Sequence, residues 1–110
     1  MSSRTEQIAK LNDLLRATFL TGKVVLTEGI ASLDDDRRAE VLSRVQSFSN
    51  FSTDNDPYGE RDFGAFEVAG AGRVFWKIDY YNGTLDGGSE DPADAKKTTR
   101  VLTIMLASEY

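Results

Sequence analysis

The stretch FGAFEVAGAGRVFWKIDYY, from Phe63 to Tyr81, decides the fold that the sequence predicts. Two runs rich in aromatic and β-branched residues, Phe63–Ala69 and Arg73–Tyr81, flank the tripeptide Gly-Ala-Gly at positions 70–72. Glycine reaches the positive φ angles that a short turn between strands requires. The pattern therefore indicates a β-hairpin.

Side chains of the second strand are expected to alternate between two faces, because successive residues of a strand point to opposite sides of a sheet. One set is predicted to face the core: Val74, Trp76, Ile78 and Tyr80, with Phe66 and Val68 as partners across the hairpin. The other set is Phe75, Lys77, Asp79 and Tyr81. This second set either faces solvent or packs beneath a helix, and the sequence leaves both options open.

The chain before the hairpin predicts a helix, a strand and a second helix. Residues 4–18 carry an apolar stripe at helical spacing. The stripe consists of Ile8, Leu11, Leu14 and Leu15. Lys23–Thr27, with the sequence KVVLT, is a β-branched run typical of a short strand. A second helix is expected over Ser32–Phe48, with Ser32 as its N-cap and three aspartates in its first turn.

The chain after the hairpin predicts a loop and then a third helix. The segment NGTLDGGSED is rich in glycine and acids, which favours irregular structure. Asp91 followed by Pro92 resembles the capped start of a helix, and a wide apolar band follows it up to Tyr110. The predicted fold class is therefore α+β, in the order α-β-α-β-β-α. A small antiparallel sheet, made of one strand plus the hairpin, carries three helices packed mainly on one face, within a single domain of residues 1–110.

Composition favours binding over catalysis. The chain contains no cysteine and no histidine, which excludes thiol nucleophiles and zinc sites built on those residues. We expect no catalytic residue, no metal and no cofactor. No apolar run approaches the ~20 residues of a membrane helix, and the start MSSRTEQIAK lacks a secretory signal, so a cytoplasmic location without membrane contact is expected.

Charge is distributed unevenly along the chain. Residues 54–94 contain ten acidic and three basic residues, a net charge of −7, whereas the rest of the chain has a net charge of +2. An acidic segment repels the phosphate backbone of nucleic acids and attracts a basic protein surface. We therefore expect no direct binding of nucleic acid.

The sequence DNDPYGERD, from Asp54 to Asp62, holds four acids around a Pro-Tyr-Gly turn. Read as a calcium loop it fails, because Tyr58 and Ala65 stand at two ligand positions. An irregular cation site, a two-carboxylate catalytic pair with Asp79 or Asp86, and a well-formed β-turn at Pro57 all remain open.

The predicted partner-binding residues come from this loop, from the exposed set of the hairpin and from the second loop. The charged members are Asp54, Asp56, Glu60, Asp62, Asp86, Glu90 and Asp91, and the aromatic members are Tyr58, Phe75 and Tyr81. Aromatic side chains beside charged ones are typical anchors of protein interfaces.

Three strings, NDPYGERDFGAFEV, RVFWKIDYYN and TRVLTIMLASEY, carry a resemblance to a known family. The chain resembles small bacterial proteins of plasmids and conjugative elements that are classed as domain of unknown function 3768. The resemblance spans nearly the whole chain and implies no established activity. It places such proteins among anti-restriction and plasmid-maintenance genes.

These observations together predict a non-enzymatic, acidic binding protein of mobile-element type. It is expected to act as a monomer or small homo-oligomer and to inhibit or modulate a basic, nucleic-acid-handling host protein, as an anti-restriction or anti-CRISPR protein does. Two alternatives remain: an enzyme or regulator that uses a divalent cation on the Asp54–Asp62 loop, or a structural accessory protein of plasmid maintenance.

Overall fold

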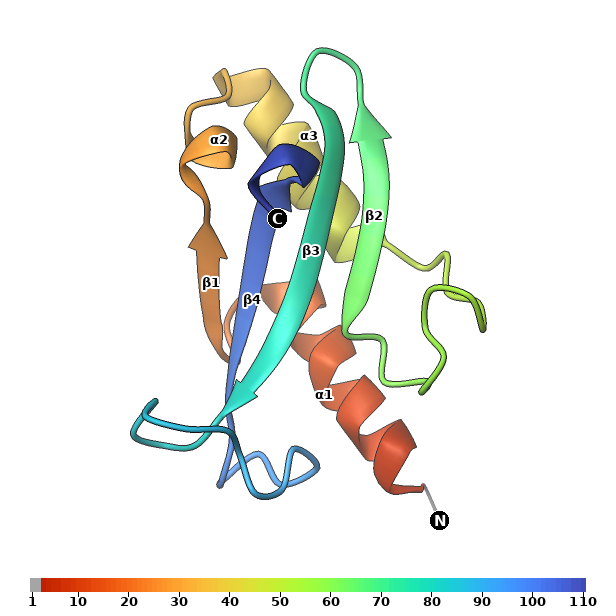
Figure 1. The fold of residues 1–110 in the computed structure, drawn as a ribbon, viewed down its shortest axis with the longest axis vertical. Helices are drawn as coiled ribbons and strands as arrows, with labels where there is room; N and C mark the ends of the chain where they lie inside the picture. The colour runs from red at the N-terminus through yellow and green to blue at the C-terminus, as the bar shows by residue number, and fades with distance from the viewer. Residues whose placement is uncertain (1–2) are drawn as a thin grey trace.

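A computed structural model describes residues 3–110 as a four-stranded sheet with helices on one face. The strands are β1 (Lys23–Leu26), β2 (Phe63–Val68), β3 (Gly72–Tyr81) and β4 (Thr99–Leu106), in the spatial order β1-β4-β3-β2. The helices are α1 (Arg4–Thr18), α2 (Glu28–Ala31) and α3 (Asp35–Ser47), and a 3₁₀ turn, η1 (Ala107–Glu109), follows β4. Figure 1 shows this arrangement with the sheet in front of α1 and α3.

The predicted hairpin is confirmed. β2 and β3 pair antiparallel, with Phe66 opposite Val74 and Val68 opposite Gly72. Gly70 and Gly72 adopt φ angles of 86° and 88°, which residues with a side chain rarely reach. The predicted core face is also confirmed, since Val74, Trp76 and Ile78 are buried.

The predicted third helix is wrong, because residues 99–106 form strand β4. Asp91 does accept the N–H of Ala93 on its side chain and that of Asp94 on its backbone carbonyl, but these bonds close a turn instead of starting a helix. β4 is rich in β-branched and other large apolar residues, which fit a sheet. Antiparallel pairing with β3 along the whole of β4 satisfies backbone groups of both strands, and this long-range gain outweighs the local helix signal.

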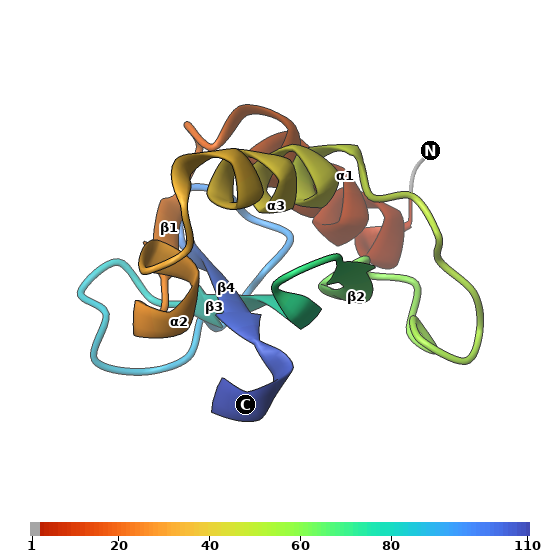
Figure 2. The same cartoon turned by 90° about the horizontal axis from the view of Figure 1, so that it is seen from above.

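The sheet is mixed, which corrects the predicted all-antiparallel sheet. β4 lies between β3 and β1, antiparallel to the first and parallel to the second. Parallel neighbours need a long connection, and two helices and a hairpin separate β1 from β4 along the chain. Seen from above, α1 and α3 lie side by side on one face and η1 projects from the other (Figure 2).

The helix starting at Asp35 begins later than predicted. Asp34, not Ser32, is its N-cap, and the Asp34 carboxylate accepts the backbone N–H of Arg37. Ser32 instead ends the short helix α2. Among residues 3–110, no helix is long and apolar enough to cross a lipid bilayer.

The buried face of α1 differs from the predicted stripe. Ile8 and Leu15 are buried as expected, but Leu14 is 46% exposed, whereas the polar residues Asn12 and Arg16 are buried. The helix therefore turns two polar side chains toward the sheet. Asn12 finds partners on β3 and in the loop before β2, and Arg16 finds them at the end of α3, which hydrophobic periodicity alone does not reveal.

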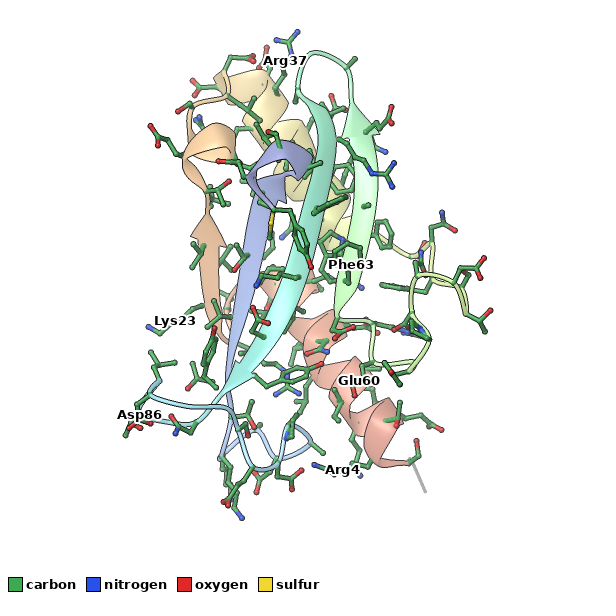
Figure 3. The ribbon with its side chains drawn as sticks, in the orientation of Figure 1. Arg4, Lys23, Arg37, Glu60, Phe63 and Asp86 are labelled. Carbon is green, nitrogen blue, oxygen red and sulfur yellow. The ribbon has the colours of Figure 1, made fainter. Side chains whose placement is uncertain are left out.

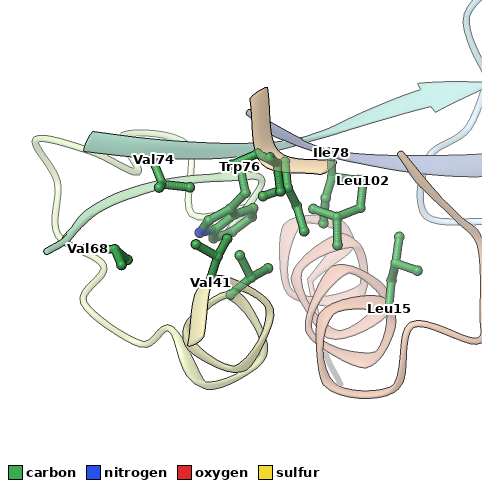
Figure 4. Packing of buried hydrophobic residues seen from close by; sticks show 10 residues of the cluster. Leu15, Val41, Val68, Val74, Trp76, Ile78 and Leu102 are labelled. Carbon is green, nitrogen blue, oxygen red and sulfur yellow. The ribbon is translucent and has the colours of Figure 1, made fainter. Parts of the chain in front are cut away.

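The core is built around Trp76, whose indole is fully buried between the sheet and α3 (Figure 4). Phe48 and Phe51 meet the indole edge to face, with ring centroids 5.6 and 6.1 Å away. On β2, the residue opposite Trp76 is Gly64, and a Cβ atom there would lie 2.3 Å from the indole nitrogen. The absence of a side chain at Gly64 is what admits the indole.

We therefore expect Gly64→Ala to destabilise the fold by about 1–3 kcal/mol, because the added methyl overpacks the indole. Urea unfolding followed by tryptophan fluorescence measures the loss. Gly83→Ala is the matched control, since a Cβ there meets nothing within 4 Å. Equal stability of the two variants would contradict the close packing at Gly64.

Candidate functional site

The acidic loop, residues 49–62, connects α3 to β2 and is shaped by local hydrogen bonds. The Asp56 carbonyl accepts the N–H of Gly59, whose φ is 73°, which closes the predicted turn at Pro57. The Asp56 carboxylate then accepts the N–H of Arg61 at 3.0 Å. Arg61 itself has a φ of 56°, so the backbone turns sharply just before β2 begins.

A buried polar cluster holds this loop against α1 and β3. Asn12 donates both to the Glu60 carbonyl, at 3.0 Å, and to the Tyr80 hydroxyl, at 2.8 Å. The Tyr80 hydroxyl donates to the Glu60 carboxylate at 2.8 Å. Arg100 completes the cluster by donating to the Asn12 side-chain oxygen at 2.7 Å. Because every member has a partner, burial of these polar groups is compensated.

The same cluster reaches the second loop, residues 82–98. Arg100 lies on β4, and its guanidinium also donates to the Pro92 carbonyl. Burial raises the pKa of Tyr80, and the neighbouring charge of Glu60 adds to that effect. The Tyr80 hydroxyl therefore keeps its proton and donates a hydrogen bond to the Glu60 carboxylate. One buried group of side chains from α1, β3 and β4 thus positions both loops.

Four carboxylates of the acidic loop lack a basic partner. Among the ion pairs of residues 3–110, none involves Asp54, Asp56, Glu60 or Asp62. Burial raises the pKa of Asp62, and the charges of Glu60, Asp56 and Asp79 raise it further. Asp56, Glu60 and Asp79 are therefore close enough to Asp62 for their charges to repel it.

Asp79, which the predicted site omitted, is one of the acids whose charge raises the pKa of Asp62. It lies on β3 and forms an ion pair with Lys77 at 2.9 Å. The hairpin register indicates this position. If the pairing is continued beyond Phe63 and Lys77, Asp79 lies opposite the end of the acidic loop. Across residues 3–110, no three acidic side chains converge closely enough to hold a metal ion.

The acids of the second loop are engaged in hydrogen bonds and ion pairs and lie apart from the acidic loop. Asp86 accepts hydrogen bonds from the side chains of Asn82 and Thr84. Figure 3 shows Asp86 well away from Glu60. The other two acids form ion pairs: Asp91 with Arg4 at 2.8 Å and Glu90 with Lys97 at 3.6 Å. The ten predicted residues therefore do not form one patch.

The aromatic residues of the predicted site also divide. Tyr58, at the tip of the acidic loop, is 81% exposed. Phe75 and Tyr81 lie on the sheet face opposite α1 and α3, so no helix of that layer covers them. Phe75 is half-buried by Phe63 and by Tyr110, whose ring centroids lie 5.4 and 5.5 Å away. Their role in binding stays a prediction.

Removing the Tyr80 hydroxyl tests whether the polar cluster holds the loop. We expect Tyr80→Phe to lower the free energy of unfolding by about 1–3 kcal/mol, because Asn12 and Glu60 lose a buried partner. Hydrogen exchange should also quicken in the acidic loop. Tyr81→Phe removes the same atom from the opposite face of β3 and is the matched control. If both variants unfold at the same urea concentration, the cluster does not support the loop.

The raised pKa of Asp62 predicts a pH-dependent effect. A carboxyl with a higher pKa in the folded state binds protons more tightly there, so it destabilises the fold as pH rises through that pKa. Asp62→Asn should therefore raise the melting temperature by a few degrees at pH 7, and the gain should vanish near pH 3. Asp54→Asn, at an exposed position, should change it less. A gain that persists at pH 3 would show that ionisation of Asp62 is not the cause.

Comparison with known proteins identifies the family. A family model described as Protein of unknown function (DUF3768) matches residues 26–109, which include the acidic loop, the hairpin and β4 but not α1. No curated protein and no solved structure shows significant similarity to the chain. Because the family model covers well over half of the chain, this protein belongs to the DUF3768 family.

Proposed function

We propose that this protein is a non-enzymatic binding protein that receives a basic partner on its acidic loop. The observation that carries this proposal is the set of Asp54, Asp56, Glu60 and Asp62, which share one loop and form no ion pair within residues 3–110. The charges of Asp56 and Glu60 repel that of Asp62 in the free protein. A cationic partner surface relieves that repulsion.

The anchoring of the loop supports this function. Hydrogen bonds from Asn12 and Tyr80 hold Glu60, and an ion pair of 2.6 Å ties Arg61 to Asp13 on α1. A loop held in place before binding loses less conformational entropy when the partner arrives. The exposed ring of Tyr58 then offers an apolar anchor beside the charges.

The partner class follows from charge and from the resemblance to mobile-element proteins. Proteins that grip nucleic acid do so through positive grooves that accept phosphates. Carboxylates on a protruding loop occupy such a groove in place of phosphates. We therefore propose that the partner is a basic, nucleic-acid-handling host protein, such as a restriction or CRISPR component, met in the cytoplasm and inhibited or modulated by this binding.

Neutralising the loop tests the proposal. In the triple variant Asp54→Asn, Asp56→Asn and Asp62→Asn, each amide keeps the shape of the acid and Glu60 stays in place for Tyr80. The variant and the native protein are used as baits in host lysate at low and high salt, and the captured proteins are assayed for DNA binding. We expect the native bait to capture a DNA-binding protein, to block its binding to DNA and to release it at high salt.

The control variant removes the same number of negative charges as the loop variant, but from α3. Asp35→Asn, Asp36→Asn and Glu40→Gln remove three exposed acids from α3. This control should capture the same protein with the same salt dependence, whereas the loop variant should lose most of it. Equal losses in both variants would point to net charge, and unchanged capture by the loop variant would refute the proposal.

A further inference from the structure

A pocket on the helical side of the molecule has a composition unlike the rest of this acidic chain. Its volume is about 420 Å³, within the range of small-molecule sites. α1, the end of α3 and the start and end of the acidic loop line it. The lining side chains used below are Asp13, Arg16, Ala17, Phe48, Phe51 and Arg61.

The charges of this pocket sum to a positive value. Asp13 is shared between two arginines, with one carboxylate oxygen 3.0 Å from Arg16 and the other 2.6 Å from Arg61. One carboxylate cannot neutralise two guanidinium groups, so the pocket carries a net charge of about +1. The whole chain, by contrast, has a net charge of −5.

The two arginines differ in how much of their hydrogen-bonding capacity is used. The Arg16 side chain is 5% exposed and donates to the carbonyls of Val45 and Phe48, and its Nε is buried without a partner among residues 3–110. Arg61 is 49% exposed. Of the three nitrogens of the Arg61 guanidinium, only Nη1 donates a hydrogen bond within residues 3–110, so Nη2 and Nε remain available.

One side of the pocket is apolar, and Arg61, which lines it, has an unusual backbone conformation. Phe48 and Phe51 pack edge to face, and the Arg61 guanidinium lies 5.8 Å from the Phe51 ring centroid. Arg61 reaches this place through a φ of 56°, which a residue with a side chain adopts only where the surrounding structure holds it. That conformation turns its side chain back onto α1 instead of out into the acidic loop.

We propose that this pocket binds the carboxylate of an aromatic acid. The carboxylate takes the free N–H groups of Arg61 as a charge-assisted pair, and the aromatic ring rests against Phe51. A single negative charge matches the net charge of the pocket. A phosphate dianion fits less well, because the carboxylate of Asp13 already lies against both arginines.

Benzoate is the probe that tests this site. We expect millimolar benzoate to shift the amide NMR signals around Arg61 and Phe51 and to raise the melting temperature, since a ligand of the folded state stabilises it. Benzamide has the same shape without the charge and should give neither effect at equal ionic strength. Equal effects of benzoate and benzamide, or tighter binding of inorganic phosphate, would overturn the proposal.

Arg61→Gln should weaken benzoate binding by roughly 10-fold or more, the loss expected for a charge-assisted hydrogen-bonded pair. Arg44→Gln is the matched control, because Arg44 is similarly exposed, lies 4.7 Å from the Phe66 ring and lines a hollow of about 410 Å³. Ala17→Leu fills the pocket from α1 without altering either arginine and should also weaken binding. Undiminished binding by both Arg61→Gln and Ala17→Leu would refute the site.

A short peptide ending in phenylalanine separates two sources of the same chemical group. If the peptide with a free terminal carboxylate binds more tightly than benzoate and its amide does not bind, the occupant is the end of a protein chain. If benzoate binds and the peptide does not, the occupant is a free aromatic acid. If the peptide amide binds as tightly as the free peptide, no carboxylate is recognised and the proposal fails.

Discussion

The contact between the Trp76 indole and its surroundings is the constraint on which the other parts of the structure depend. The indole needs Gly64 opposite it on β2, because any side chain there would occupy the same space. Phe48 and Phe51 close over it from the end of α3 and the start of the acidic loop. Arg16 of α1 covers it with a guanidinium group 4.7 Å from the ring. The hairpin, both long helices and the acidic loop therefore meet at one buried ring.

Arg16 connects the buried Trp76 ring to charged groups at the surface. Burial of a guanidinium is costly unless its donors are satisfied, and Arg16 uses carbonyls at the end of α3 and the carboxylate of Asp13. Burial lowers the pKa of Arg16, and the hydrogen bond and charge of Asp13 oppose that effect. Because Asp13 also holds Arg61, packing of the core sets the direction in which Arg61 points. Arg61 consequently lies against α1 with its side chain half exposed, while the neighbouring Glu60 carboxylate is held by Tyr80.

The buried polar cluster adds a second link between interior and surface. Asn12, Tyr80 and Arg100 come from three elements and satisfy one another, so their geometry is tightly defined. Glu60 and Pro92 are the points at which this cluster touches the two loops. Loops held in this way keep their charges in a defined pattern, which is what recognition of a charged partner requires.

The sequence by itself determined the features that depend on near neighbours in the chain. The Gly-Ala-Gly turn and the alternation around Trp76 predicted the hairpin and its core face, and Pro57 predicted the turn of the acidic loop. Clustering of acids along residues 54–94 was also visible, as was the membership of the chain in its family.

Only the tertiary structure decided the features that depend on distant partners. Residues 99–106 became a strand because β3 and β1 offered two edges for hydrogen bonding, and no local pattern contains that information. Asn12 and Arg16 became buried because residues 29–88 positions away supply their hydrogen-bond partners. The predicted acidic patch divided partly for the same reason: Asp86 is held by Asn82 and Thr84 of its own loop, whereas Asp91 pairs with Arg4, 87 positions away, and only the fold brings these two residues together.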